Sequence, residues 1–158
     1  VVIFYPHTSN WDFVIGIVAR AAIWLPIRWA GKDTLFRRPF GGIFCWLGGI
    51  PVNRRERTGL TARLAREFAQ RERFYLAITP EGTRSHTDRW KSGFYHLALA
   101  AKVPLGLAYI DYPRKRIGIG GYLELTGNEA VDLDALRRFY ADKIGKCPEN
   151  QGEIRFVH

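Results

Sequence analysis

The sequence predicts an α/β fold: one domain, residues 1–158, in which a central sheet, largely parallel or mixed, is flanked by helices. Short runs of β-branched and aromatic residues alternate at least three times with longer, helix-like segments. Two of the apolar runs end at a proline and are followed directly by polar residues. A composition of 47% hydrophobic and 14% aromatic residues excludes a disordered chain and is enough for a buried core.

In the first half of the chain, residues 1–5 (VVIFY) are typical of a buried strand that ends at a proline. Residues 13–29 have apolar side chains on nearly all sides, which favours a buried or half-buried helix. Residues 33–38 form a polar, basic break. The glycine-rich stretch 40–50 has no clear periodicity, and residues 50–53 are typical of a short strand.

The second half begins with an amphipathic helix from Thr58, because apolar residues recur there every four positions. The other expected elements, in chain order, are a strand at 74–79, a helix at 92–101, a strand at 103–110, one or two strands within 117–125, and a helix at 132–143. Ligands of parallel sheets bind at the carboxyl ends of the strands. Two polar segments, 7–12 and 81–85, directly follow predicted strands and therefore lie at such ends.

The chain is basic, with 24 Lys and Arg against 15 Asp and Glu and a net charge of +9. This charge attracts polyanions: nucleic acid, anionic lipid, a nucleotide cofactor or an acidic carrier protein. The two cysteines form neither a disulfide framework nor a metal-ligand spacing, which favours a reducing compartment.

No transmembrane helix is expected, because the longest stretch without an ionisable side chain, 39–53, is shorter than the roughly 20 apolar residues of a span. Trp24, Trp29 and Trp46 stand near several Arg and Lys residues and are typical either of an interfacial anchor or of an interior aromatic cluster. The chain starts at Val1 without a methionine, which leaves a missing amino-terminal segment open.

His7 and Asp12 are candidates for acid–base chemistry. On one continuous helix their spacing places the side chains about 140° apart, so they meet only if His7 precedes the helix and Asp12 lies in its first turn. Thr8, Ser9 and Asn10 are good N-cap residues and predict that arrangement. A carboxylate beside an imidazole fixes its tautomer, and the imidazole then accepts a proton from a hydroxyl. The alternative is a histidine that only ends a strand and an aspartate that only favours the helix dipole.

The segment EGTRS, which follows the second proline-ended strand, suits a phosphate group. Gly82 permits a tight turn, Arg84 offers a planar fork of donors, and Thr83 and Ser85 add hydroxyls. Glu81 is expected to orient a cation or a loop rather than to touch phosphate. The alternative is an ordinary polar turn with a surface ion pair.

A third candidate is the run of cations that follows the short strand, Asn53-Arg54-Arg55 with Arg57. It is either the opposite wall of an anion site or a solvated basic loop.

In order, these segments resemble the blocks of the glycerolipid acyltransferases, the family that includes lysophosphatidic acid acyltransferase. HTSNWD (7–12) resembles the first block, in which four residues separate His and Asp, and GIPVNR (49–54) the second. TPEGTRS (79–85) is similar to the third and is the most specific. Residues 90–98 resemble the stretch that follows, and Val103-Pro104 the start of the fourth block, whose usual second proline is absent here.

The resemblance implies that His7 is the general base, that Asp12 orients it, and that the acceptor hydroxyl attacks a fatty acyl thioester directly. It implies that substrate, including the acceptor's phosphate, is bound by residues of the second and third blocks and beyond: Arg54, Glu81, Gly82, Thr83, Arg84, Ser85 and Lys91. The donor that the resemblance implies is acyl-CoA or acyl-carrier protein, and the acceptor that it implies is a lysophospholipid or a glycerol-phosphate-like compound. Neither a metal nor a bound cofactor is implied.

We therefore expect an O-acyltransferase that works at the cytoplasmic face of a membrane, attached peripherally or monotopically. Two other functions stay open. One is a non-catalytic basic module for anionic lipid or nucleic acid, although the sequence contains no recognisable nucleic-acid-binding motif. The other is an acyl thioesterase, in which water replaces the acceptor.

Overall fold

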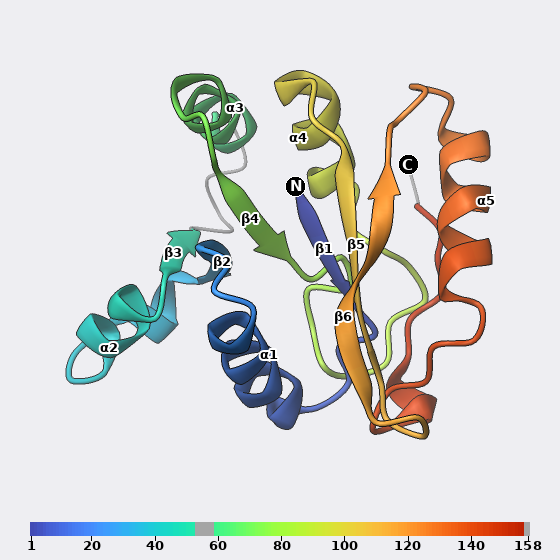
Figure 1. The fold of residues 1–158 in the computed structure, drawn as a ribbon, viewed down its shortest axis with the longest axis horizontal. Coiled ribbons are helices and arrows are strands. Elements are labelled where there is room, and N and C mark those ends of the chain that lie inside the picture. Colours follow the sequence, from blue (N-terminus) through green and yellow to red (C-terminus); the bar gives the residue numbers. More distant parts are fainter. Residues whose placement is uncertain (53–58, 157–158) are drawn as a thin grey trace.

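The computed structural model describes residues 1–52 and 59–156, and six strands within them form one sheet in the order β3-β2-β4-β1-β5-β6 (Figure 1). The strands are β1 (Val2–Tyr5), β2 (Ile27–Lys32), β3 (Gly49–Val52), β4 (Tyr75–Ile78), β5 (Leu105–Asp111) and β6 (Arg116–Leu123). All neighbouring pairs are parallel except β5 and β6, which are antiparallel. The predicted fold class, with a largely parallel, mixed sheet, is confirmed.

β1 lies between β4 and β5 and pairs with both in parallel. Ile3, for example, is in register with Ile78 of β4 and with Leu107 of β5. The sequence VIFY suits this central place, because a strand covered on both faces needs an almost continuous apolar run. The register puts the carboxyl end of β1 beside those of β4 and β5, so the loops that follow these three strands meet at one edge of the sheet.

Helices surround this sheet (Figure 1). They are α1 (Asn10–Ala22), α2 (Gly41–Trp46), α3 (Leu60–Gln70), α4 (Gly93–Ala101) and α5 (Glu129–Tyr140), with 3-10 turns at Asp33–Phe36 and Pro148–Asn150. In Figure 1, α3 and α4 lie side by side at the top, α1 lies at the bottom, and α5 lies beside the β5–β6 hairpin. None of the helices in the described part of the chain is long and apolar enough to span a bilayer.

The amphipathic helix predicted from Thr58 is α3; Thr58 itself lies outside the described residues. Leu64 is buried in the core, with Leu60 and Phe68 packed against it, as the four-residue repeat predicts. The strands predicted at 1–5, 50–53, 74–79 and 103–110 and the helix predicted at 92–101 are also present, with boundaries shifted by one or two residues.

The helix predicted over 13–29 is wrong beyond Ala22. α1 ends there, Trp24 takes a left-handed backbone conformation with φ 53°, and Pro26 has no N–H to continue a helix. The next residues form β2, which is paired in parallel with β3 and β4. The apolar residues on all sides suit a strand buried in a sheet as well as a buried helix, and the sequence pattern does not distinguish the two.

The glycine-rich stretch 40–50 contains α2 and the start of β3. Its glycines allow aromatic rings to pack directly on the backbone: a Cβ on Gly49 would lie 2.6 Å from the ring of Phe36. Phe36, Phe13 and Phe44 surround Trp29, whose ring centroid is 4.8 Å from that of Phe13. Trp29 thus belongs to an interior aromatic cluster, one of the two alternatives.

Trp24 and Trp46 are 92% and 82% exposed, so they do not belong to an interior cluster, and their role as an interfacial anchor stays a prediction. In the second half, residues 117–125 contribute to a single strand, β6. The helix predicted from residue 132 begins earlier, at Glu129, because the side chain of Asn128 caps it by accepting the Val131 N–H at 3.4 Å.

Candidate active site

His7 and Asp12 lie together where β1 passes into α1. His7 precedes the helix and Asp12 lies in its first turn, the arrangement that the cap residues predict. His7 Nδ1 is 3.4 Å from Asp12 Oδ2, with 14% of the His7 side chain exposed and that of Asp12 fully buried. At this distance the two groups meet the criterion for an ion pair but not for a hydrogen bond, since His7 Nδ1 is buried and has no hydrogen-bond partner among the described residues. Contacts of acid–base pairs are often long before substrate binds. Because Nδ1 faces Asp12, Nε2 is the nitrogen left to exchange a proton with a ligand.

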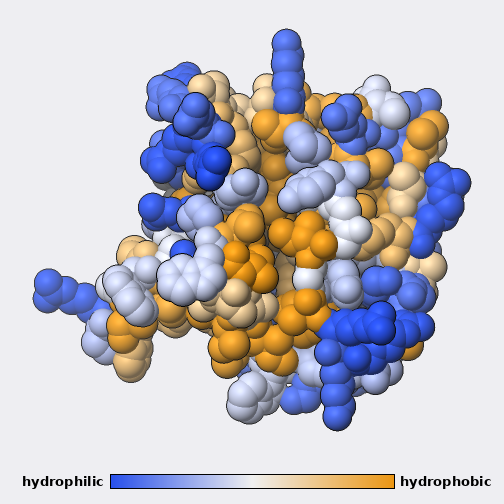
Figure 2. All heavy atoms as spheres, viewed as in Figure 1, coloured by the Kyte–Doolittle hydropathy of each residue, from blue (hydrophilic) through white to orange (hydrophobic). Residues whose placement is uncertain are grey.

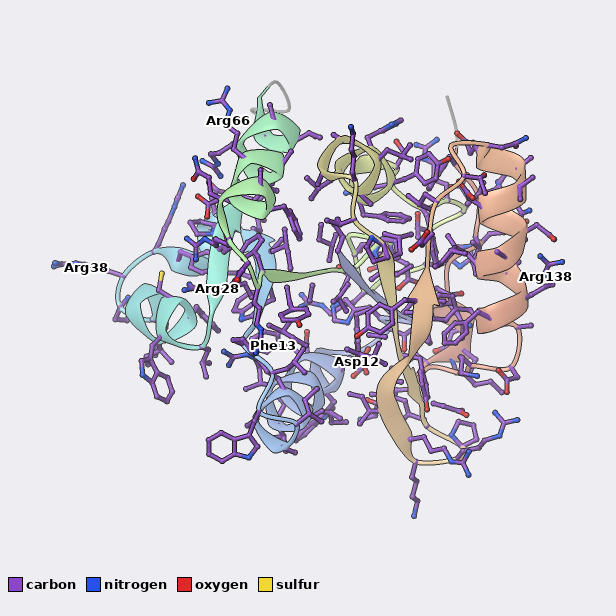
Figure 3. All side chains as sticks on the ribbon, turned by 45° about the horizontal axis from the view of Figure 1, so that its top comes forward. Asp12, Phe13, Arg28, Arg38, Arg66 and Arg138 are labelled. Carbon is purple, nitrogen blue, oxygen red and sulfur yellow. The ribbon has the colours of Figure 1, made fainter. Side chains whose placement is uncertain are left out.

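The cap of α1 is what joins the two side chains. Ser9, the N-cap, has an extended backbone and accepts the Trp11 N–H on its hydroxyl at 3.3 Å. Asp12 Oδ2 accepts the N–H groups of Thr8 and Ser9 at 2.7 and 2.8 Å. The same carboxylate therefore completes a capping box and faces the imidazole of His7, which lies two residues before the N-cap. Figure 3 shows Asp12 between the start of α1 and the β5–β6 hairpin.

The Asp12 carboxyl is held in its charged form. Burial would by itself raise the pKa of Asp12, but the neighbouring His7 ring, the Tyr112 hydroxyl and the two backbone N–H groups outweigh burial and lower the pKa. At neutral pH the carboxylate is therefore available to stabilise an imidazolium at His7.

Glu81 connects the third sequence block to the first. Glu81 Oε2 accepts the His7 N–H at 2.7 Å, and Oε1 accepts the Gly152 N–H at 2.8 Å. The residue is only 2% exposed, so its carboxyl holds two backbone segments instead of facing solvent. This position favours the loop-orienting role and does not support direct substrate binding by Glu81.

Burial raises the pKa of Glu81 to about 7, although the N–H groups of Gly152 and His7 oppose the shift. The free energy of unfolding should therefore fall by about 3 kcal/mol as the pH rises from about 4.5 to about 7. Between these values the unfolded chain has lost the Glu81 proton while the folded protein keeps it, so each step up in pH favours unfolding.

Chemical denaturation at a series of pH values measures this effect. The variant Glu81→Gln is neutral throughout and should lack this part of the slope. A difference in stability between the two proteins that stays constant with pH would show that Glu81 ionises alike in the folded and unfolded states.

The residues after Glu81 turn back at the same edge of the sheet. Gly82 has φ 65°, and its N–H donates to the Thr79 carbonyl at 3.1 Å. A Cβ on Gly82 would lie 2.8 Å from Lys91 Nζ, so the Lys91 side chain crosses this turn. The Lys91 N–H also donates to the Pro80 carbonyl at 2.9 Å. The side chains that follow are exposed: Thr83, Arg84 and Ser85.

The structure thus gathers His7, Asp12, Glu81, Gly82 and Lys91 around the carboxyl ends of β1 and β4. The second block is different. Asn53, Arg54, Arg55 and Arg57 lie outside the described residues, so their place opposite the Arg84 loop stays a prediction.

Tyr112 is a residue of this site that the sequence analysis missed. It directly follows β5, and its hydroxyl donates to Asp12 Oδ1 at 2.6 Å. A signal for it was present, because the predicted strand at 103–110 is followed by Asp111 and Tyr112, and the carboxyl ends of parallel strands share one edge.

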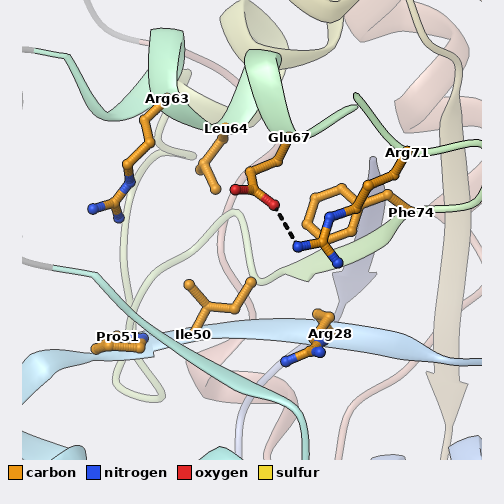
Figure 4. Close-up of a pocket in the computed structure, with 8 residues that line it drawn as sticks. All are labelled: Arg28, Ile50, Pro51, Arg63, Leu64, Glu67, Arg71 and Phe74. Atoms are coloured by element: carbon orange, nitrogen blue, oxygen red, sulfur yellow. Dashed lines mark ion pairs between the residues drawn. The ribbon is translucent and has the colours of Figure 1, made fainter. Parts of the chain in front are cut away.

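A separate cavity of about 420 Å³ lies between α3 and the strands β2 and β3 (Figure 4). Its lining combines apolar side chains with four charged ones: Arg28, Ile50, Pro51, Arg63, Leu64, Glu67, Arg71 and Phe74. Glu67 and Arg71 pair with each other at 2.9 Å. Of the predicted site residues that the structure describes, none lines this cavity.

Within residues 1–52 and 59–156, no three His, Cys, Asp or Glu side chains are grouped as metal ligands would be. That the chain uses no bound cofactor stays a prediction.

Comparison with known proteins identifies the family of this chain. A family model described as acyltransferase matches residues 1–109. The chain belongs to the acyltransferase family. The resemblance seen in the sequence blocks is thereby confirmed, and the match includes His7, Asp12 and Glu81, whereas Tyr112 and Gly152 lie beyond it.

This acyltransferase-family chain is 35% identical over 106 residues to the 1-acyl-sn-glycerol-3-phosphate acyltransferase of Escherichia coli strain K12, which covers 63% of this chain and 42% of that protein. It is 36% identical over 83 residues to the alpha 1-acyl-sn-glycerol-3-phosphate acyltransferase of Mus musculus, covering 49% of this chain and 26% of the relative. The chain spans less than half the length of these relatives. No solved structure matches it.

Proposed function

We propose that this acyltransferase-family chain transfers a fatty acyl group from an acyl thioester to the hydroxyl of a glycerolipid acceptor that carries a phosphate. The first candidate acceptor is 1-acyl-sn-glycerol-3-phosphate, after which the relatives are named. The observation that carries the proposal is the pair formed by His7 Nδ1 and Asp12 Oδ2, 3.4 Å apart at the carboxyl end of β1.

The reaction needs a base more than it needs a protein nucleophile. His7 Nε2 takes the proton of the acceptor hydroxyl while its oxygen attacks the thioester carbonyl carbon. The new C–O ester bond forms, the C–S bond breaks, and the proton passes from His7 to the leaving thiolate. Asp12 stabilises the imidazolium between these two proton transfers.

The exposed loop that follows Glu81 suits the acceptor's phosphate. Arg84 offers a bidentate fork of donors, and Thr83 adds a hydroxyl. The Glu81 carboxyl ties the start of this loop to the backbone of His7 at 2.7 Å, so phosphate binding and the general base share one rigid connection. Arg54 is proposed as a second contact to the phosphate from the other wall.

The proposal includes the surface of a membrane as the place of reaction, on its cytoplasmic face. Figure 2 shows hydrophobic side chains gathered over α1. Exposed large apolar residues occur in α1, in α2 and next to them: Val14, Val18, Ile23, Trp24, Phe40, Ile43 and Trp46. Arg37 and Arg38 are exposed beside them, and Figure 3 shows Arg38 extending outward from the fold. Exposed tryptophan with flanking cations suits an anionic lipid interface.

The test is a panel of donors and acceptors. Acyl-CoA or acyl-carrier protein is mixed with vesicles that contain lysophosphatidate, glycerol 3-phosphate is offered in separate reactions, and free thiol and lipid products are measured by absorbance and mass spectrometry. Thiol release that requires the acceptor, with an acylated lipid as product, supports the proposal. Release at full rate without any acceptor would make the protein a thioesterase, and no release from either donor would refute the transfer reaction. Flotation of the vesicles reports membrane binding in the same samples.

The variant Arg84→Ala should raise the KM for the phosphate-bearing acceptor by about 10- to 100-fold, since a charge-assisted bidentate contact is lost, and should leave the KM for the donor unchanged. Steady-state kinetics with each substrate varied in turn measures both values. Arg138→Ala is the matched control, because Arg138 is equally cationic and exposed but pairs with Asp134 on α5 at 3.1 Å. If both variants raised the KM for the acceptor equally, Arg84 would act only through the net charge of the protein and not through a contact to the phosphate.

A further inference from the structure

We propose that Tyr112 is a positioning residue for the His7–Asp12 pair: its hydroxyl holds Asp12 Oδ1 so that Oδ2 stays directed at the imidazole. Tyr112 lies beyond the residues that the family model matches, and the inference rests on the proposed function.

The two oxygens of Asp12 are held from different parts of the chain. Oδ2 accepts two backbone N–H groups of the α1 cap and lies 3.4 Å from His7 Nδ1. Oδ1 accepts the Tyr112 hydroxyl at 2.6 Å across a sequence separation of 100 residues. A carboxylate bound through both oxygens cannot rotate about its Cβ–Cγ bond, so the oxygen that faces the imidazole is fixed.

Tyr112 is itself fixed by the carboxyl-terminal part of the chain. Its N–H donates to the Ile144 carbonyl at 3.0 Å, and a few residues later the Cys147 N–H donates to Thr8 Oγ1 at 3.1 Å. Gly145 packs so closely on Thr8 that a Cβ there would lie 2.7 Å from its hydroxyl oxygen. One segment, residues 144–147, therefore braces both Tyr112 and the loop between His7 and Asp12.

The hydroxyl stays protonated under working conditions. Burial, and then the bond to the Asp12 carboxylate, raise the pKa of Tyr112 well above its usual value. Tyr112 is thus a permanent donor that orients Asp12 and takes no part in proton transfer itself.

The experiment removes this one hydroxyl. Tyr112→Phe should lower kcat for acyl transfer about tenfold with unchanged KM for donor and acceptor, as expected for one hydrogen bond to a charged group in the transition state. The matched control is Tyr95→Phe, which removes another tyrosine hydroxyl that donates to a buried carboxylate, that of Asp132, at 2.9 Å. That bond joins α4 to the start of α5, so this variant should lose stability and keep its kcat.

A second comparison separates positioning from general damage. In a His7→Ala background, Tyr112→Phe should change the residual rate less than about twofold, because Tyr112 acts through Asp12 on an imidazole that is no longer there. Further slowing in that background, equal losses of kcat in Tyr112→Phe and Tyr95→Phe, or an unchanged kcat in Tyr112→Phe would overturn the inference.

Other results would refute the proposed function itself. In that case His7→Ala keeps full activity, or the unmodified protein transfers no acyl group from either donor. If His7→Ala is inactive and Tyr112→Phe is not slowed, the proposed function stands and the role of Tyr112 falls.

Discussion

Replacement of His7 by alanine should slow acyl transfer by about 10²- to 10⁴-fold, the usual contribution of a positioned general base. The imidazole is the group next to the buried Asp12 carboxylate, with Nδ1 3.4 Å from Oδ2, and it precedes the cap of α1. Without it the acceptor hydroxyl keeps its proton and is a poor nucleophile for the thioester. Acceptor-dependent thiol release at neutral pH measures the loss, and KM for both substrates should change little.

His96→Ala is the control for this variant. His96 is an exposed histidine of α4, so its removal changes the histidine content without touching the site. Thermal unfolding of both variants shows whether the fold is kept, because His7 contributes its backbone N–H to Glu81 whatever its side chain. Transfer at the full rate by folded His7→Ala would rule out general-base catalysis by this residue.

Replacement of Glu81 by alanine should lower the free energy of unfolding by about 2 to 6 kcal/mol at pH 5, since two backbone N–H groups lose their acceptor at roughly 1 to 3 kcal/mol each. These are the N–H groups of His7 and Gly152, at 2.7 and 2.8 Å from the carboxyl. The pH is chosen below the Glu81 pKa of about 7, so the carboxyl is neutral in the folded protein and relief of a buried charge does not mask the loss. Urea denaturation gives the value.

The same variant should also lose most of its transfer activity, because the backbone of His7 is no longer tied to the loop that starts at Glu81. Glu67→Ala is the control: Glu67 pairs with Arg71 on the surface of α3, and an exposed helix pair contributes only about 0.3 to 0.5 kcal/mol. Glu81→Gln keeps one acceptor oxygen, so its loss of unfolding free energy should lie between those of Glu81→Ala and Glu67→Ala. A Glu81→Ala protein as stable as Glu67→Ala would mean that solvent replaces the carboxyl at both N–H groups.

Local sequence patterns were sufficient for most of the elements and for the central pair. The alternation of apolar runs and helices predicts the α/β class, and the cap residues between His7 and Asp12 predict that the chain bends there. Caps act over three or four residues, so their information is contained in the local sequence. The order of the blocks made the family recognisable before any contact was known.

Where several conformations suit the same pattern, the sequence was not decisive. Ile27 and Trp29 continue the apolar pattern of α1, yet they lie in β2, because Pro26 has no N–H to continue a helix and β3 and β4 offer backbone partners on both sides. The tryptophans also differ from one another, which the sequence did not show: Trp29 packs against Phe13 and other rings, while Trp24 is exposed.

The sequence by itself determined which groups are available for the proposed chemistry: an imidazole and a carboxylate separated by a helix cap, followed much later by a turn that suits phosphate. The tertiary structure decided what holds them. Tyr112 reaches Asp12 and Gly152 reaches Glu81 because β5 lies next to β1 and the carboxyl-terminal segment crosses the same edge of the sheet. Contacts between residues so distant in sequence follow from strand order and register, which no local pattern specifies.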